Sequence, residues 1–224
     1  MNAVEVLARD ELPKEKREQY HALLTHGLER IQATVGKLLR FTPRSTEPTP
    51  LSLVDPVLDA IALVQHRAAL QEVEIMLTAS GERALDRQHT IERLRALPPV
   101  LGESNELAQA ILNLLVNALD ALEERHPRGG RIEIEIGREA DELRLVVQDD
   151  GPGVRPEHLA RVADLFFTTK DVGKGTGLGL AIVHNLVAQH HGRIHLSSPP
   201  GEGFRVEIYL PIVAAHRDAT ERAR

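Results

Sequence analysis

The chain has 224 residues, 42% hydrophobic and 3% aromatic, enough for one domain with a mainly aliphatic core plus an extension. Its formal net charge of −6 argues against nucleic-acid binding through a basic surface. Cysteine is absent, which excludes disulfides and thiolate metal sites. No apolar run reaches the ~18 residues of a membrane span. We therefore expect a cytoplasmic protein without a membrane span that binds no nucleic acid.

The first part of the chain has the repeat of a helix that packs against other helices. Between Lys14 and Phe41, apolar residues recur at alternating spacings of four and three: Leu24, Leu28, Ile31, Val35 and Leu38. This seam predicts a coiled coil or a four-helix bundle, which would allow a homodimer. An amphipathic helix docked on its own domain is the alternative. Residues 42–50 hold three prolines and no apolar residue, so they predict a linker.

Residues 51–213 alternate between helix and strand patterns and predict one α+β domain, followed by a charged tail at 214–224. Helices are expected at about 55–70, 105–124 and 180–191, capped by Asp55 and Ser104 and stopped by Gly192. Strands are expected at about 51–53, 73–77, 132–136, 143–147, 194–196 and 204–210. Residues 81–99 predict only a helical turn or two at 89–97, to which we assign no function.

Three polar residues lie along one side of an otherwise apolar helix. Asn113, Asn117 and Asp120 are spaced i, i+4 and i+7, so they form a stripe. Buried polar groups need partners, which here would be either neighbouring loops or a polar ligand. Amide oxygens suit Mg²⁺ that is shared with substrate phosphates. The stripe therefore favours a polar ligand with magnesium.

A second candidate site is the segment QDDGPG at residues 148–153, where a predicted strand ends. Asp149 could accept a hydrogen bond from the exocyclic amine of adenine, while Gly151 and Gly153 let the base lie against the backbone. Guanine carries a carbonyl at that position, and leaving a polar group unpaired costs ~1–3 kcal/mol. Taken alone, the segment is more typical of a tight turn.

A third candidate is the stretch around Gly173, Gly175, Thr176, Gly177 and Gly179, which precedes an apolar helical run. Glycines let backbone N–H groups approach a phosphate, and a helix N-terminus attracts anions. A lone motif of this kind would be a flexible turn. Combined with the two upstream segments, it predicts a lid over a polyphosphate.

These segments together resemble the sensor histidine kinases of two-component systems. Residues 113–121, NLLVNALDA, resemble the asparagine box, residues 149–153 the first glycine box, residues 165–170, LFFTTK, the F box, and residues 175–180, GTGLGL, the second glycine box. They occur in the family's order, and the resemblance covers residues 51–213. It implies the two-layer α/β sandwich of the ATP-binding catalytic domain, which gyrase-type ATPases share. Residues 1–41 would then be mainly the second helix of the dimerisation and phosphoacceptor hairpin.

The resemblance also implies a site for ATP or ADP with Mg²⁺. Asn117 would hold the metal and Asp149 the adenine, while Asn113 and Lys170 would act in catalysis. The other implied nucleotide contacts are Asp120, Gly151, Gly153, Phe167, Thr168, Thr169, Lys174, Gly175, Thr176, Gly177, Leu178, Gly179 and Leu180. Gyrase-type ATPases have a water-activating glutamate at the Asn113 position, and an amide cannot act as that base. The family pattern therefore favours phosphoryl transfer over hydrolysis.

The N-terminal part departs from the family, whose phosphoacceptor is a histidine followed by Glu or Asp. None of the 11 histidines here is followed by an acid. We therefore expect transfer of the γ-phosphate to a histidine not present in this chain, on a phosphoacceptor helix of the same family that serves a response regulator receiver domain. Whether the chain is a shortened form or naturally lacks the acceptor stays open. The alternatives are a gyrase-type ATPase and a non-catalytic nucleotide-binding module for dimerisation or regulator docking.

Overall fold

The computed structural model describes residues 48–80, 86–125, 128–168 and 176–213. The chain divides into two compact units, Met1–Arg44 and Ser45–Arg224, and the described residues belong to the second. The heptad segment, most of the predicted linker and the tail lie outside the described residues, so the predicted domain bounds stay predictions. No helix within the described ranges is long and apolar enough to cross a membrane.

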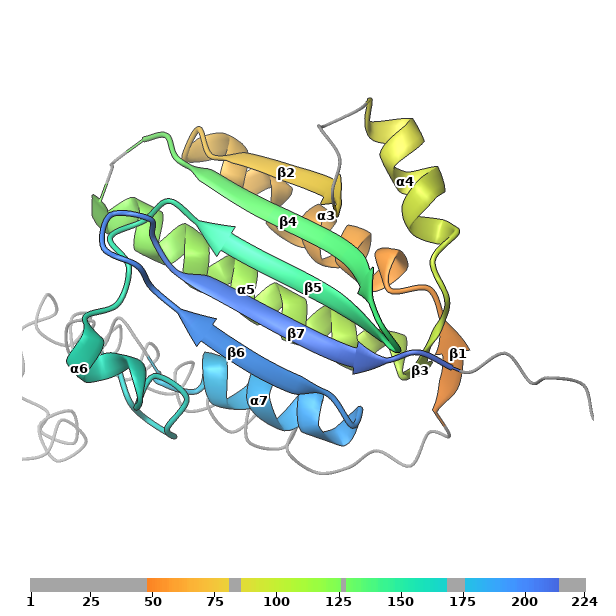
Figure 1. The fold of residues 1–224 in the computed structure, drawn as a ribbon. Helices are drawn as coiled ribbons and strands as arrows, with labels where there is room; N and C mark the ends of the chain where they lie inside the picture. Colours follow the sequence, from red (N-terminus) through yellow and green to blue (C-terminus); the bar gives the residue numbers. More distant parts are fainter. Residues whose placement is uncertain (1–47, 81–85, 126–127, 169–175, 214–224) are drawn as a thin grey trace, which may run out of the picture. The chain divides into compact units, whose positions relative to one another are not determined.

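A mixed five-stranded sheet forms one layer of the domain (Figure 1). Its strand order is β2 (Glu74–Ala79), β4 (Arg131–Glu139), β5 (Glu142–Asp149), β7 (Arg205–Pro211) and β6 (Arg193–Ser197). β2 and β4 are parallel, and the other neighbours are antiparallel. The hairpin between β4 and β5 turns at Ala140, whose φ is 54°.

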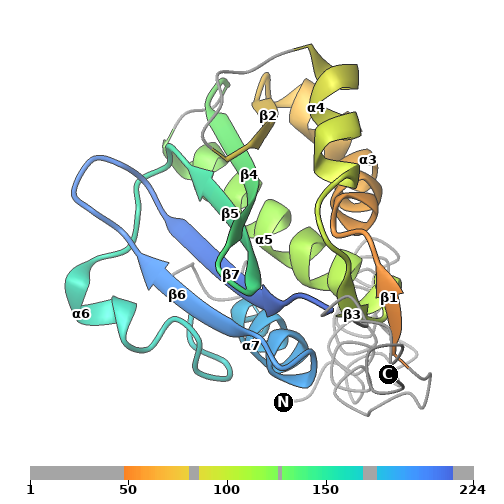
Figure 2. The same cartoon turned by 45° about the vertical axis from the view of Figure 1, so that its right-hand side comes forward.

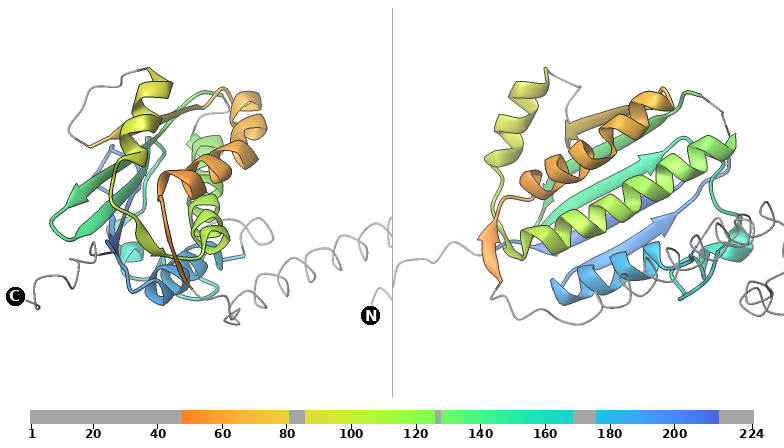
Figure 3. Two further views of the ribbon diagram at one scale, coloured as in Figure 1. Left: turned by 90° about the vertical axis from the view of Figure 1, so that its right-hand side faces the viewer. Right: turned by 180° about the vertical axis from the view of Figure 1, so that it is seen from behind.

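Three helices, α3 (Val54–Leu70), α5 (Ser104–Arg125) and α7 (Gly179–Gln189), form the second layer. They lie side by side across one face of the sheet, as the right-hand view of Figure 3 shows. The alternating isoleucines of β4, Ile132, Ile134 and Ile136, are at most 1% exposed, as are Leu115 and Leu119 of α5. The two-layer α+β sandwich expected from the sequence is thus confirmed.

Three shorter elements complete the domain, with a further short helix, α6 (Pro156–Leu159), after β5. β1 (Thr49–Leu51) pairs antiparallel with β3 (Val100–Gly102). α4 (Arg87–Arg95) stands beside α3 and the edge strand β2 (Figure 2). Our expected strand at 51–53 was wrong by two residues, because Thr49 already pairs with Gly102 in β3. The last two residues of the predicted linker are therefore strand.

Both predicted helix caps were wrong. α3 begins at Val54, before Asp55, and has no side-chain cap. α5 begins with Ser104 itself, and the carboxylate of Glu103 accepts hydrogen bonds from the backbone N–H groups of Asn105 (3.3 Å) and Glu106 (2.9 Å). A carboxylate at this position satisfies two open N–H groups and also suits the positive end of the helix dipole.

The end of α7 also differs from the expectation. The helix ends at Gln189, and the residue in the left-handed region is His191 (φ 55°), not Gly192. Gly192 is needed for a different reason, because a Cβ there would lie 2.6 Å from the carbonyl oxygen of Tyr209 in β7. The glycine therefore serves close packing of the turn on the sheet rather than the helix stop.

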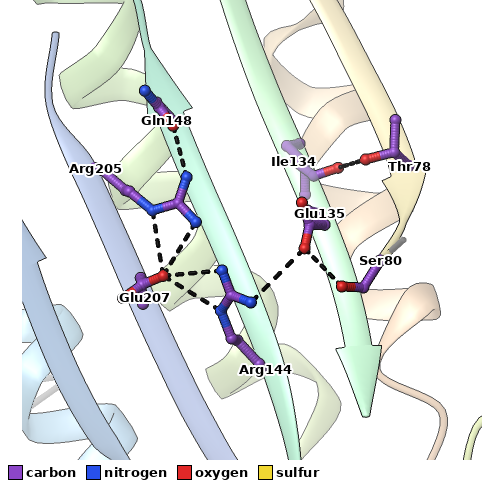
Figure 4. A network of polar contacts seen from close by, with 8 residues as sticks. All are labelled: Thr78, Ser80, Ile134, Glu135, Arg144, Gln148, Arg205 and Glu207. Carbon is purple, nitrogen blue, oxygen red and sulfur yellow. Dashed lines mark hydrogen bonds and ion pairs between the residues drawn. The ribbon is translucent and has the colours of Figure 1, made fainter. Parts of the chain in front are cut away.

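A network of charged side chains lies on the sheet face opposite the three helices (Figure 4). Oε1 of Glu207 accepts hydrogen bonds from Arg144 (3.2 and 3.0 Å) and from Arg205 (3.2 and 3.1 Å). Arg205 also donates to Gln148 (2.7 Å). Val146, whose partner in the register is Glu207, is only 2% exposed. The aliphatic stems of long polar side chains can bury such a residue while their charges neutralise one another.

We expect Glu207→Gln to lower the free energy of unfolding by about 1–2 kcal/mol at pH 7, because two arginines lose a shared anion. Burial raises the pKa of Glu207, but the hydrogen bonds and charges of Arg205 and Arg144 outweigh it and hold that pKa below its ordinary value. This stabilisation is present above the ordinary pKa of about 4.3 and is lost as the pH falls through the lowered value.

Urea denaturation at pH 7 and at pH 3 measures this effect. The difference between wild type and variant should shrink at pH 3. Glu133→Gln is the matched control, because Glu133 pairs with Arg131 (3.1 Å) on the same face with half its side chain exposed. A loss that is the same at both pH values would contradict the prediction.

Candidate functional site

Asp149 is the buried carboxylate at the end of β5, 5% exposed. Its Oδ1 accepts hydrogen bonds from the backbone N–H groups of Gly151 (2.8 Å) and Phe204 (3.3 Å). Burial raises the pKa of Asp149, and the two N–H groups, which lower it, offset this only in part. A carboxylate held at such a cost has a strong tendency to accept a further hydrogen bond.

The loop between β6 and β7 braces this carboxylate from one side. Gly203, with φ 79°, packs directly on the backbone of Asp149, and a Cβ there would overlap the Asp149 carbonyl oxygen. The hydroxyl of Ser198 accepts from Val154 N–H (2.8 Å) and donates to the carbonyl of Gly203 (2.7 Å). In the sequence, the signal for this loop is the pair of glycines on either side of Glu202.

The three polar residues of the stripe on α5 contact three different parts of the domain. Nδ2 of Asn113 donates to the carbonyl of Gln109 (2.8 Å), one turn earlier. Asn117 lies at the start of α7, since a Cβ on Gly179 would be 3.1 Å from its Nδ2 and 3.2 Å from its Oδ1. The carboxylate of Asp120 is 2.7 Å from Arg67 of α3. Among the described residues, no cluster of three or more His, Asp or Glu side chains is arranged to hold a metal.

The F box and the second glycine box meet through their backbones. Phe166 N–H donates to the carbonyl of Gly177 (2.9 Å), and both residues have positive φ, 66° and 62°. A Cβ on Gly177 would overlap the backbone of Phe166. The side chain of Phe167 packs against His158, with ring centroids 5.6 Å apart, and beneath the guanidinium of Arg161. The segment 165–168 and the start of α7 are thus held together.

α7 starts at Gly179 without a side-chain cap, so its first backbone N–H groups have no side-chain acceptor at the N-cap. Leu178 is fully buried and Leu180 is 8% exposed, so these two leucines anchor the helix start in the core. Thr176 and Thr168 are exposed. Thr169, Lys170, Lys174 and Gly175, which the sequence also assigned to the site, lie outside the described residues.

α5 brings the first glycine loop and the start of α7 together (Figure 1). Asn117 contacts Gly179, and one turn later Ala121 contacts Gly151, with 3.4 Å between the Ala121 Cβ and a Cβ placed on Gly151. Four residues on a helix are about one turn, or 5.4–6 Å. The Asn117 amide, the loop with the buried Asp149 carboxylate and the uncapped start of α7 therefore line one end of the domain. Such groups suit a base, a metal and phosphates.

Comparisons with known proteins agree with this arrangement. The family model described as histidine kinase-, DNA gyrase B-, and HSP90-like ATPase matches residues 102–214. The sensor histidine kinase ZraS of Salmonella typhimurium is 32% identical over 192 residues, which cover 85% of this chain and 37% of ZraS. The two-component sensor PprA of Pseudomonas aeruginosa is 36% identical over 174 residues, which cover 72% of this chain and 19% of PprA. The chain thus spans well under half the length of these curated relatives.

Two solved structures share both fold and sequence similarity. Full-length ShkA in complex with AMPPNP superposes with a TM-score of 0.68 at 26% identity, covering 93% of this chain and 41% of ShkA. The mycobacterial sensor histidine kinase MprB gives a TM-score of 0.58 at 26% identity, covering 75% of this chain and 99% of the MprB chain.

Proposed function

The chain belongs to the histidine kinase-, DNA gyrase B- and HSP90-like ATPases. Its described part is the ATP-binding catalytic domain of a two-component sensor histidine kinase, and we propose that it transfers the γ-phosphate of Mg-ATP to a histidine on a separate phosphoacceptor helix. A response regulator receiver domain would then take the phosphoryl group, and the heptad segment would hold two copies of the chain together. The single observation that carries the proposal is the buried carboxylate of Asp149 in its glycine loop.

Asp149 would recognise the adenine. Both of its backbone hydrogen bonds engage Oδ1, so the exocyclic amine of adenine would approach Oδ2. Gly151 and Gly153 would let the loop close around the carboxylate. A Cβ on Gly151 would lie 2.6 Å from Oδ1 of Asp149. Gly153 has φ 73°, and a Cβ there would lie 2.5 Å from the Ser198 hydroxyl. A guanine carbonyl at the same place would face a carboxylate oxygen, which disfavours it.

The phosphates would lie at the start of α7, where the backbone from Thr176 to Leu180 offers N–H groups and the positive end of the helix dipole. Asn117, which contacts Gly179, would give a neutral oxygen to Mg²⁺. When bound, the ion would neutralise phosphate charge. The roles of Phe167, Thr168, Thr169, Lys170, Lys174 and Gly175 in holding the nucleotide rest on the sequence resemblance alone.

Asn113 favours transfer over hydrolysis. Its Nδ2 is held by the Gln109 carbonyl (2.8 Å), which directs Oδ1 away from that carbonyl. An amide oxygen can orient a group by hydrogen bonding but cannot take its proton. Phosphoryl transfer depends chiefly on positioning and charge stabilisation, so such a site needs an acceptor delivered in line with the γ-phosphate. Asp120 forms an ion pair with Arg67 (2.7 Å), so any effect of Asp120 on nucleotide binding would depend on that ion pair.

We expect the chain to label an acceptor helix of this family supplied in trans when γ-labelled ATP and Mg²⁺ are present. The label should be acid-labile, as on phosphohistidine, and this chain should retain none. Asn117→Ala should need more Mg²⁺ for the same rate, by about tenfold. Asn105→Ala, in the exposed first turn of the same helix, is the matched control.

Three results would contradict the proposal. Steady ATP hydrolysis without an acceptor would favour the gyrase-type alternative. Nucleotide binding without transfer would favour a non-catalytic module. His26 is one of two histidines in the heptad segment. Acid-labile label on this chain that disappears in His26→Ala would place an acceptor within it.

A further inference from the structure

The loop that carries Asp149 rests on the last turns of α5. Gly151 packs against Ala121, whose small side chain allows the loop to approach the helix. Arg125 follows one turn later on the same face of the helix. Its Nη1 donates to two successive backbone carbonyls of the loop, those of Asp150 (2.5 Å) and Gly151 (2.6 Å). Hydrogen bonds from a guanidinium are stronger than neutral ones.

The geometry of one peptide unit links Arg125 to the carboxylate. The Asp150 carbonyl and the Gly151 N–H belong to the same planar trans peptide, so they point in opposite directions. Arg125 holds the carbonyl on the side of α5, and the N–H on the other side donates to Oδ1 of Asp149 (2.8 Å). The Asp150 side chain fixes the loop at a second point by accepting from Arg131 N–H (2.7 Å).

We propose that Arg125 is a positioning residue for base recognition: it fixes the 150–151 peptide so that the Gly151 N–H orients the Asp149 carboxylate toward the base of the nucleotide. The proposal rests on the proposed function, since it assigns Arg125 to the adenine end of that site. Arg125 acts from outside the base pocket and prepares the loop before the nucleotide arrives. Preorganisation of this kind contributes affinity by reducing the ordering needed on binding.

Arg125 should affect the affinity only for ligands that contain the adenine base. Without the guanidinium, the 150–151 peptide loses the hydrogen bond on its carbonyl side, so the Gly151 N–H holds the rotamer of Asp149 less firmly. Adenosine and ADP should both bind about tenfold more weakly to Arg125→Met, the worth of a charged hydrogen bond. Mg-tripolyphosphate, which has no base, should bind with unchanged affinity. A general loss of structure would weaken all three probes.

The test is calorimetric titration of the full chain with ADP, adenosine and Mg-tripolyphosphate, together with amide hydrogen exchange of the unliganded chain. Arg125→Lys should restore most of the adenosine affinity, because an ammonium group can donate to both carbonyls. Arg128→Met is the matched control, since Arg128 lies three residues further on and pairs with Glu72 (3.2 Å) at the surface. The Gly151 amide should exchange faster in Arg125→Met than in wild type or the control.

Several outcomes would overturn the inference. Adenosine affinity equal to wild type in Arg125→Met would do so, as would an equal loss for Mg-tripolyphosphate or unchanged exchange at Gly151. If wild type binds ADP and Arg125→Met binds it equally well, only this inference fails. If wild type itself binds no ADP, the proposed function fails and this inference fails with it.

Discussion

Asp149→Ala should weaken ADP binding about 100-fold, because the adenine amine loses a charged acceptor in a buried site. Asp149 is 5% exposed, so water cannot readily take the place of the missing oxygen. The N–H groups of Gly151 and Phe204 lose their acceptor in the same variant. Part of the loss would therefore come from a loosened loop, and calorimetry with ADP measures the sum.

Asp149→Asn separates the charge from the shape. The asparagine Oδ1 can still accept from Gly151 and Phe204, while Nδ2 presents N–H donors where the carboxylate presented an oxygen. ADP should again bind about 100-fold more weakly, since two donors then face each other. IDP, which has a carbonyl in place of the adenine amine, should bind the variant better than ADP does. Equal ADP affinity in wild type and Asp149→Asn would refute the assignment.

The raised pKa of Asp149 gives this prediction a dependence on pH. Burial disfavours the ionised form, so the carboxyl should take up a proton at a higher pH than an ordinary aspartate. ADP affinity of wild type should fall as the pH falls through that value, and that of Asp149→Asn should not. The stability of the fold should depend on pH in the opposite direction from ADP affinity. A raised pKa means stability that is lost as the pH rises, so Asp149→Asn should unfold at a somewhat higher temperature than wild type at pH 7.

The sequence predicted β4 well because its residues alternate strictly. Ile132, Ile134 and Ile136 alternate with Arg131, Glu133 and Glu135, and the former are buried while the latter lie on the open face. Such a period-2 pattern assigns a face to every residue without knowledge of the partners. The long apolar run of α5 was equally clear. The positions of Asp149 and Asn117 were therefore predictable as the end of a strand and one side of a helix.

The contacts that hold these residues were not predictable, because they join segments far apart in the chain. Arg125 reaches loop carbonyls 25 and 26 residues later, and Phe204 donates to a carboxylate 55 residues earlier. The family resemblance assigns Asp120 to the nucleotide, and the packing also brings its carboxylate within 2.7 Å of Arg67 on another helix. Spacing along one helix shows which residues share a side, but only the packing shows which neighbour each of them meets.

Gly203→Ala should have the second large effect, on stability as well as on binding. An alanine at φ 79° is strained, at about 1–3 kcal/mol, and its Cβ would overlap the carbonyl oxygen of Asp149. Backbone cannot move aside as a flexible side chain can, so the 198–204 loop must shift away from β5. We expect the free energy of unfolding to fall by about 3–4 kcal/mol.

Gly201→Ala is a matched control in the same loop. Gly201 has φ 83°, almost the same backbone strain for alanine, but nothing lies within 4 Å of a Cβ there. Its cost should be the strain alone, about 1 kcal/mol, with ADP affinity unchanged. In Gly203→Ala, the shift of the loop should instead move the Phe204 N–H away from Asp149. The folded molecules of this variant should therefore bind ADP about tenfold more weakly. Urea denaturation and ADP titration of both variants measure the two effects. Equal losses in the two variants would show that strain alone acts and that the loop does not support the carboxylate.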